Sequence, residues 1–260
     1  MNYKTISIEK KGEVGILYLN RPKVLNALSN DMRLEVMHFI NQAAGDEGLR
    51  VLILTGKGRA FSAGADLNMF KSRYETYKRE GKNDDYVRAD LAKTFIEFPK
   101  PIIAAINGLA VGFGLTVTLI CDIRLASKKA KFSCAFVRVG VTPEFGSSYF
   151  LPRLIGYGKA AELVFTARMI EAEEALQIGL VNQIVEHETL LSEAENMAQE
   201  IAKMPSEAIK TAKQVLRHGY HSTLEQVLEY ESLVFLHNTR TKEHYEAVCR
   251  ILEQIKKPKG

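Results

Sequence analysis

Cysteine is scarce in this chain of 260 residues, and the three cysteines lie far apart in the sequence. Cys121, Cys134 and Cys249 are odd in number and form no CxxC pair, which argues against a disulfide framework and a cysteine-rich zinc site. Unpaired cysteines are typical of a reducing compartment, so we predict a cytoplasmic location. The first fifteen residues, MNYKTISIEKKGEVG, hold no apolar stretch of signal-peptide length, and we expect no secretory leader there.

A strong excess of one charge is also lacking. Lysine and arginine total 35 against 31 acidic residues, a formal net charge of +4, and they are dispersed along the chain, so we predict no nucleic-acid partner. The stretch 101–121 carries no charge, but it contains Asn107 and three glycines, which would break and polarise a membrane-spanning helix. We therefore predict a buried strand, a glycine-rich turn and a buried helix there, and no membrane span.

Several motifs that would identify a site are missing. The glycines at 108, 112 and 114 lack the G-x-G-x-x-G spacing, and neither a phosphate-binding G-x-x-x-x-G-K-[ST] loop nor a G-x-S-x-G nucleophile elbow occurs. The six histidines make no convincing metal-ligand spacing; the pair His218 and His221 is more typical of a solvated surface. We predict no metal site.

What the sequence does contain is an alternation of strand and helix patterns. Alternating residues at 4–9 and 14–20 predict a hairpin, and apolar spacing over 29–44 predicts a helix that ends at Gly45. Further segments continue the alternation: strands at 49–55, 101–106 and 122–126, and helices at 86–98 and 113–121. The pattern predicts an α/β core built from repeated strand–strand–helix units.

The last part of the chain is almost purely helical in pattern. We predict helices at 194–203, 206–218, 223–237 and 241–255, with only a weak strand pattern at 233–235. This change divides the chain into a core, residues 1–197, and a helical C-terminal region, residues 198–260. A helical tail of this kind commonly packs on a neighbouring chain.

Two glycine-bearing turns each stand where a strand ends and a helix begins. They are residues 58–67 (GRAFSAGADL) and 107–114 (NGLAVGFG). Small side chains leave backbone N–H groups accessible, and a helix N-terminus adds unpaired donors and a positive dipole end. If the two turns face each other, two converging N–H donors would form an oxyanion hole. Either turn alone is more often just a connection.

These segments, in this order, resemble the crotonase (enoyl-CoA hydratase/isomerase) superfamily. The resemblance rests on LNRPKVLNALS, VLILTGKGRAFSAGADL, PKPIIAAINGLAVGFGLTVTLICDIRLAS, AKFSCAFVRVGVTPEFGSSYFLPRLIG and GKAAELVFTARMIEAEEALQIGLVNQIV, and covers nearly the whole chain. It implies a spiral of strand–strand–helix units with a C-terminal helical region. It also implies an acyl-CoA thioester as substrate, no cofactor beyond the coenzyme A of that substrate, and assembly as a homotrimer or hexamer.

The resemblance also implies residue roles. The oxyanion donors would be the N–H groups of Ala65, after Gly64, and Phe113, after Gly112. The adenine would lie near Ala63. Other positions implied to bind substrate are Arg21 and Lys23, near the phosphates, with Leu25, Asp66, Leu67 and Phe136. An aspartate before a helix is also a good N-cap, which is the better role for Asp66.

One carboxylate remains for the chemistry. Hydratases of the superfamily carry glutamates at the positions of Thr116 and Phe136, which cannot activate water or deliver a proton, so we expect Thr116→Ala to change the rate little. Glu144, in VTPEFGSSYFLP, instead resembles the glutamate of the peroxisomal-type 3-enoyl-CoA to 2-enoyl-CoA isomerases. Such an isomerase, acting in fatty acid oxidation, needs a single base. An apolar pocket that raises the pKa of the base would help, and Phe113, Phe136, Phe145 and Val141 are its expected walls.

Three alternatives stay open. The first is an isomerase of ring-derived acyl-CoA, although such enzymes tend to carry aspartate at the position of Glu144. The second is a hydratase that combines Glu144 with another acid. The third is a degenerate acyl-CoA or RNA binder without activity. Acyl chain length would depend on a polar segment, residues 68–85, that we predict to be a mobile lid.

Overall fold

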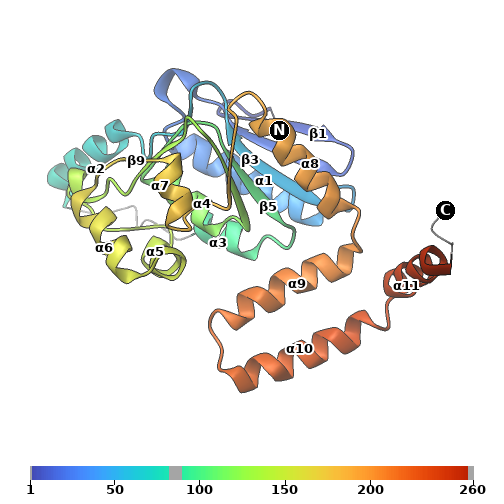
Figure 1. The fold of residues 1–260 in the computed structure, drawn as a ribbon. Coiled ribbons are helices and arrows are strands. Elements are labelled where there is room, and N and C mark those ends of the chain that lie inside the picture. Colours follow the sequence, from blue (N-terminus) through green and yellow to red (C-terminus); the bar gives the residue numbers. More distant parts are fainter. Residues whose placement is uncertain (1, 82–89, 257–260) are drawn as a thin grey trace.

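The computed structural model describes residues 2–81 and 90–256, and its chain begins with the predicted hairpin. Strand β1 (Ile6–Lys11) pairs antiparallel with β2 (Val14–Leu19), with Ile6 opposite Leu19. Strand β2 also pairs in parallel with β3 (Val51–Gly56) on its other edge. Every residue of β2 is buried, because its side chains enter core clusters on both faces of the sheet. The hairpin therefore forms one edge of a larger sheet (Figure 1).

Two sheets make up the core. The larger has the order β1-β2-β3-β5-β7-β10, and the smaller has the order β4-β6-β8-β9. The remaining strands are β5 (Ile102–Ile106), β7 (Ile123–Ser127) and β10 (Gln183–Val185) in the larger sheet, and β4 (Ala60–Ser62), β6 (Leu109–Val111), β8 (Lys131–Ser133) and β9 (Ile170–Glu171) in the smaller. Each of the pairs β3/β4, β5/β6 and β7/β8 sends one strand to each sheet. The chain thus winds as a spiral, which confirms the predicted α/β core of strand–strand–helix units.

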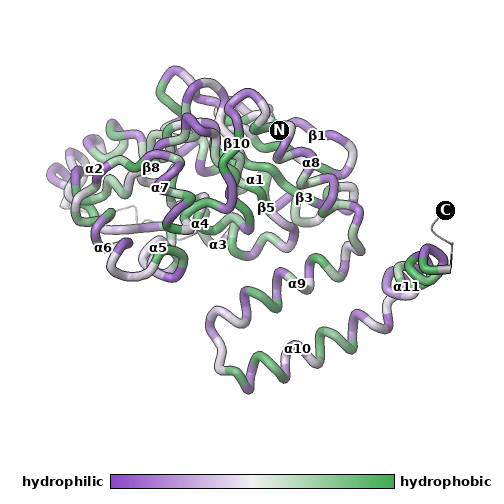
Figure 2. The backbone as a smooth tube through the Cα atoms, in the orientation of Figure 1, coloured by the Kyte–Doolittle hydropathy of each residue, from purple (hydrophilic) through white to green (hydrophobic). Residues whose placement is uncertain are grey.

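Helices cover both faces of the larger sheet. One face packs against α1 (Asn30–Gly45), α3 (Asp90–Glu97) and α4 (Phe113–Ile120), and all of α4 is buried. The other face packs against α8 (Leu190–Ala202) through small residues that include Ala194 and Ala198. Figure 2 shows the strands between these helices as largely hydrophobic. The proposed division at residues 197/198 falls inside α8, whose buried side belongs to the core.

The other elements lie around this core. They are the 3-10 helices η1 (Pro22–Val24) and η2 (Val137–Val139) and the helices α2 (Leu67–Glu80), α5 (Ser147–Ile155), α6 (Tyr157–Thr166) and α7 (Ala172–Gln177). The polar segment 68–85 was expected to be a mobile lid; it is helical as far as Glu80, and residues 82–89 lie outside the described residues. The start of the helix predicted for 86–98 also falls in that gap.

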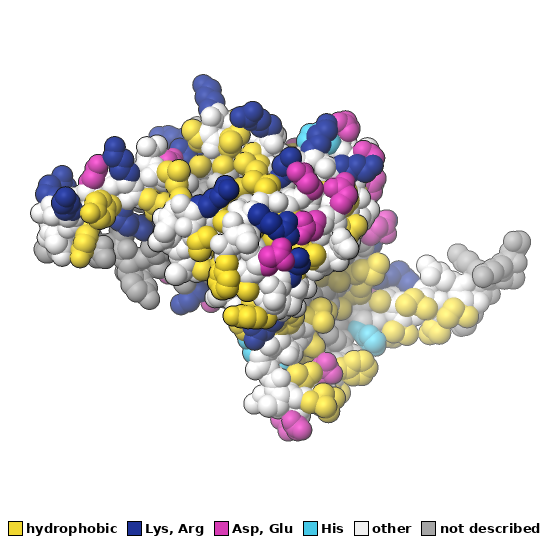
Figure 3. All heavy atoms as spheres, turned by 60° about the vertical axis from the view of Figure 1, so that its left-hand side comes forward, with side chains coloured by type: hydrophobic (Ala, Val, Ile, Leu, Met, Phe, Trp, Pro, Cys, Tyr) yellow, Lys and Arg dark blue, Asp and Glu magenta, His cyan; other side chains and the backbone are white. Residues whose placement is uncertain are grey.

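The C-terminal helices extend away from the core as an arm (Figure 1). The arm consists of α9 (Ser206–Gly219), α10 (Leu224–Asn238) and α11 (Lys242–Lys256). The predicted helical region is confirmed, and the weak strand pattern at 233–235 is wrong because those residues continue α10. Many large apolar side chains on the arm are exposed, among them Leu233 and Phe235, and Figure 3 shows hydrophobic side chains gathered along it.

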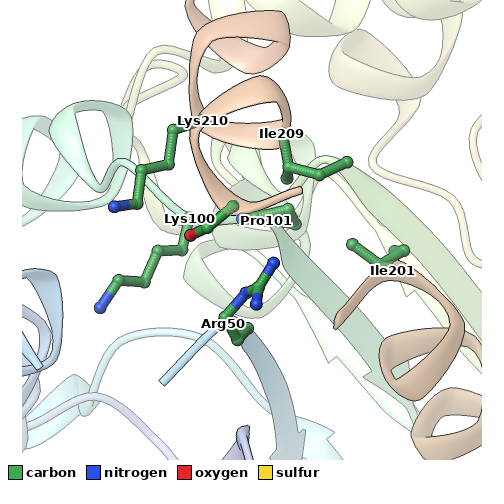
Figure 4. Close-up of a pocket in the computed structure, with 7 residues that line it drawn as sticks. Arg50, Lys100, Pro101, Ile201, Ile209 and Lys210 are labelled. Atoms are coloured by element: carbon green, nitrogen blue, oxygen red, sulfur yellow. The ribbon is translucent and has the colours of Figure 1, made fainter. Parts of the chain in front are cut away.

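Buried basic residues attach the arm to the core. The Lys213 ammonium of α9 lies 2.8 Å from the Asp122 carboxylate and donates to the Lys100 carbonyl at 2.7 Å. A small cavity of about 10 Å³ at this junction is lined by Arg50, Lys100 and Lys210, among others. Figure 4 shows the two lysine side chains extending away from the Arg50 guanidinium. Because the cavity has room for about one water and the cations do not converge, it is a structural junction rather than a binding site.

No described helix is both long and apolar enough to cross a lipid bilayer.

Candidate active site

The two glycine-bearing turns lie against each other. Strand β4 pairs with β6, so the residues that follow these strands are neighbours. Gly64 and Gly112 have φ values of +102° and +49°, a backbone region that L side chains rarely adopt. A Cβ on Gly64 would lie 3.0 Å from the Val111 carbonyl oxygen and 3.9 Å from the Gly112 Cα. The two turns are therefore in contact, which is the condition that an oxyanion hole built from both would require.

Each turn carries a backbone N–H group that has no protein acceptor among the described residues, and the two residues that carry these groups line one cavity. Ala65 is held between two bonds to Leu28: the Leu28 N–H donates to the Gly64 carbonyl at 2.8 Å, and the Asp66 N–H donates to the Leu28 carbonyl at 3.0 Å. Phe113 is the first residue of α4, where an N–H has no partner within the helix. Across the two described stretches of chain, neither the Ala65 nor the Phe113 N–H donates to another protein group. Two such donors suit a developing oxyanion.

Both turns open onto a cavity of about 960 Å³. Its walls come from α1, α2, the two turns and the segment 135–144, and most of them are apolar. The lining includes Leu28, Met37, Leu67, Phe70, Val111, Phe136, Val139 and Val141. A cavity of this size and character suits an organic ligand with an apolar part.

Glu144 lines the same cavity, on the segment between η2 and α5. Its backbone carbonyl accepts hydrogen bonds from the Ser147 N–H at 3.0 Å and the Ser147 hydroxyl at 2.7 Å. Its carboxylate Oε1 accepts a hydrogen bond from the Thr116 hydroxyl at 3.0 Å. Burial raises the pKa of Glu144, and the hydrogen bond from Thr116 offsets part of this rise. The residue as a whole is nevertheless exposed, since it stands on the wall of an open cavity.

Phe145 corrects one detail of the predicted pocket. Phe113, Phe136 and Val141 line the cavity as expected, but Phe145 is not among the lining residues. Its backbone has φ +58°, and its ring packs edge-on against Phe113, with centroids 5.3 Å apart. The side chain is therefore turned away from the cavity and packs behind it.

The residues expected to bind substrate fall into two groups. Ala63, Gly64, Leu67, Gly112 and Phe136 line the cavity together with Ala65, Phe113 and Glu144. The others, Arg21, Lys23, Leu25 and Asp66, do not line it. Lys23 is exposed on η1, and the Leu25 carbonyl accepts a hydrogen bond from the Ala63 N–H at 2.9 Å.

Asp66 has the structural role expected of it. Its carboxylate accepts a hydrogen bond from the Asn68 N–H at 3.2 Å and so caps the N-terminus of α2. The Arg21 guanidinium lies 3.2 Å from the same carboxylate and donates to the Ala27 carbonyl at 2.6 Å. Arg21 therefore braces the turn that carries Ala65.

Sequence reasoning missed two features of the site. It treated Thr116 as a bystander, although the helical spacing of three residues from Phe113 was a usable signal that both face the same side. It also gave no indication of three cations that line the cavity, Arg33, Arg73 and Arg138. These come from α1, α2 and η2, which are far apart in the sequence. Among the described residues, no group of three or more His, Cys, Asp or Glu side chains could hold a metal ion.

Known proteins agree with this architecture. The enoyl-CoA hydratase/isomerase family matches residues 9–259. The short-chain-enoyl-CoA hydratase of Clostridium acetobutylicum is 37% identical over 98% of this chain and 97% of its own. The 1,2-epoxyphenylacetyl-CoA isomerase of Escherichia coli is 34% identical over 87% and 86%. A crystal structure of enoyl-CoA hydratase from Bacillus anthracis has a TM-score of 0.88 and 33% identity, over 96% and 97% of the two chains. The chain belongs to the enoyl-CoA hydratase/isomerase family.

Proposed function

We propose that the protein moves the double bond of a 3-enoyl-CoA to position 2, with Glu144 as its single acid–base group. The observation that supports this most is the placement of Glu144 in one apolar-walled cavity with Ala65 and Phe113, whose N–H groups donate to no other described residue. Burial raises the pKa of Glu144, which brings a carboxylate closer to the proton affinity that acid–base catalysis needs.

The proposed reaction transfers one proton from carbon 2 to carbon 4 of the acyl chain. The Glu144 carboxylate removes a proton from carbon 2, which the thioester and the neighbouring alkene both acidify. The electrons of that C–H bond delocalise into a dienolate, whose oxygen accepts hydrogen bonds from the Ala65 and Phe113 N–H groups. The carboxylic acid of Glu144 then returns the proton to carbon 4. The product is a 2-enoyl-CoA, and Glu144 is again ionised.

Hydration of a 2-enoyl-CoA is the second candidate. It is favoured by the names of relatives such as the Clostridium acetobutylicum hydratase. Adding water requires a group that activates water and a group that delivers a proton. Thr116 and Phe136 stand at the positions where hydratases of the superfamily carry their two glutamates, so Glu144 would have to serve with another acid. The Escherichia coli relative makes isomerisation of a ring-derived acyl-CoA a third candidate.

A comparison of two substrates tests the proposal. We expect the purified protein to convert 3-hexenoyl-CoA to 2-hexenoyl-CoA, followed by ultraviolet absorbance of the conjugated product, and to hydrate crotonyl-CoA little above background. Fast hydration with slow isomerisation would favour the hydratase instead. If the protein binds both thioesters but converts neither, it would be a non-catalytic acyl-CoA binder.

We also propose that the C-terminal region packs against other copies in a homotrimer or hexamer. The exposed apolar side chains of the arm support this, since isolated large apolar patches are costly in water. Light scattering of the wild type and of a Leu233→Glu, Phe235→Glu double variant tests it. We expect a trimer or larger for the wild type and a smaller species for the variant; a monomeric wild type would contradict the proposal.

A further inference from the structure

The hydroxyl of Thr116 has two possible acceptors and one proton to donate. It lies 3.3 Å from the Phe113 carbonyl of its own helix and 3.0 Å from Glu144 Oε1. A hydrogen bond to an ionised carboxylate is roughly twice as strong as one between neutral groups. The contact with Glu144 is both the shorter and the stronger of the two, so the Thr116 hydroxyl donates its proton to Glu144. Thr116 is fully buried, with an exposed fraction of 0%, and the hydroxyl has no access to an alternative in bulk water.

We propose that Thr116 is a positioning residue that holds the Glu144 carboxylate in register with the oxyanion donor of Phe113. The effect on turnover rests on the proposed function. Thr116 and Phe113 both belong to the first turn of α4, so the base and one oxyanion donor are attached to a single rigid element. A fixed distance between base and oxyanion site is what makes proton abstraction efficient.

The backbone around Glu144 is held by contacts to two helices, α4 and α5. The Phe145 ring that follows it packs against the ring of Phe113, and the Ser147 hydroxyl donates to the Glu144 carbonyl. These contacts fix the main chain but leave the long side chain free to rotate. Among the described residues, Thr116 is the one side chain that donates a hydrogen bond to the carboxylate.

Other charges do not explain the state of this carboxylate. The charged groups on the cavity wall are Arg33 of α1, Arg73 of α2, Asp90 of α3 and Arg138 of η2. Within the described part of the chain, the influences on the pKa of Glu144 are burial and the Thr116 hydrogen bond, and none of these four charges is among them. Helix α4 carries no charged residue, and the one charged residue of α5, Arg153, donates to the Tyr149 carbonyl. The hydroxyl is therefore the closest polar influence on the proton affinity of Glu144.

The test compares Thr116→Val, which keeps the shape and loses the hydroxyl, with Thr116→Ser, which keeps the hydroxyl. Thr118→Val is the matched control, because Thr118 is also buried on α4 but its hydroxyl donates to the Leu115 carbonyl. We expect Thr116→Val to lower kcat for 3-hexenoyl-CoA about tenfold or more, with little change in KM, because it loses a hydrogen bond to a charged group. Thr116→Ser should restore most of kcat, and Thr118→Val should leave it unchanged.

A second readout does not depend on turnover. The Glu144 carboxyl carbon can be titrated by NMR in protein labelled with ¹³C at glutamate, and assigned by its loss in Glu144→Gln. We expect its titration midpoint to rise in Thr116→Val, by about one pH unit for a tenfold effect, and to stay near the wild-type value in Thr118→Val. If the wild type lacks isomerase turnover, the proposed function fails but this titration still decides the role of Thr116. An unchanged midpoint in Thr116→Val, or an unchanged kcat in an active enzyme, would overturn the proposal.

Discussion

Replacement of Gly114 strains the contact between the two turns. It is the second residue of α4, and a Cβ built there would lie 2.2 Å from the Ser62 carbonyl oxygen and 2.9 Å from the Ser62 Cβ. These are atoms of a buried strand residue, so the clash cannot be relieved by rotating a side chain. In Gly114→Ala, α4 and β4 must move apart, and the Phe113 N–H must move with α4.

The magnitude can be worked from two opposing effects. Alanine in a helix gains up to about 1 kcal/mol over glycine, and overpacking a core typically costs about 1–3 kcal/mol. With a contact as short as 2.2 Å to backbone, we expect the upper end of that cost and a net loss of about 2 kcal/mol. For a chain of this length, this lowers Tm by roughly 4–8 °C.

Gly158 supplies the control. It lies in α6, and a Cβ there would meet nothing within 4 Å, so Gly158→Ala should be neutral or slightly stabilising. Circular dichroism during heating gives Tm for both variants, and turnover of 3-hexenoyl-CoA gives kcat. We expect Gly114→Ala to lose both stability and kcat, since a shift of about 1 Å in a catalytic group can cost a hundredfold in rate. Equal Tm and kcat in the two variants would refute the argument that the turns are in close contact.

Three further results are expected. Because burial raises the pKa of Glu144, the acid limb of kcat/KM should lie above pH 4.5, the ordinary glutamate range; a limb at or below that value would contradict the apolar setting. Burial lowers the pKa of Lys213 to about 8, so between there and about pH 10.4 the unfolded state binds more protons. The free energy of unfolding, measured in urea, should therefore rise with pH in that window by up to about 1.4 kcal/mol per unit, relative to Lys213→Met, and parallel pH dependences would contradict this. Asp66→Ala should cost about 1 kcal/mol through loss of the α2 cap, whereas Asp66→Asn should retain most of it; equal losses would point to the ion pair with Arg21 instead.

Much of the fold was predictable because its signals are local. The hairpin at β1 and β2, the helices α1 and α4, and the helical arm each follow from apolar periodicity, and Gly45 and Gly219 mark the ends of α1 and α9. The meeting of the two turns required more, because the pairing of β4 with β6 joins segments about fifty residues apart. From the sequence, contact between the turns was one possibility, because each turn precedes a helix N-terminus. The structure places Gly64 and Gly112 close together.

The parts that were not predictable depend on side-chain direction. The backbone of Phe145 is left-handed, which turns its ring onto Phe113 and away from the cavity. The hydrogen bond between Thr116 and Glu144 joins residues 28 positions apart, and no pattern in either segment indicates it. The three arginines of the cavity wall could not be predicted either, because they lie on α1, α2 and η2, which are far apart in the sequence and meet only in the folded chain.

Glu144→Gln tests the central claim most directly. Glutamine keeps the shape and the capacity to accept a hydrogen bond from Thr116 but cannot take a proton, and Glu188→Gln, at a glutamate that does not line the cavity, controls for the loss of charge. Isomerisation of 3-hexenoyl-CoA and affinity for the same thioester are measured on each variant. We predict that Glu144→Gln binds the thioester normally and loses about 10²–10⁴-fold in kcat, with Glu188→Gln unchanged. Wild-type turnover by Glu144→Gln would contradict the assignment of Glu144 as the base.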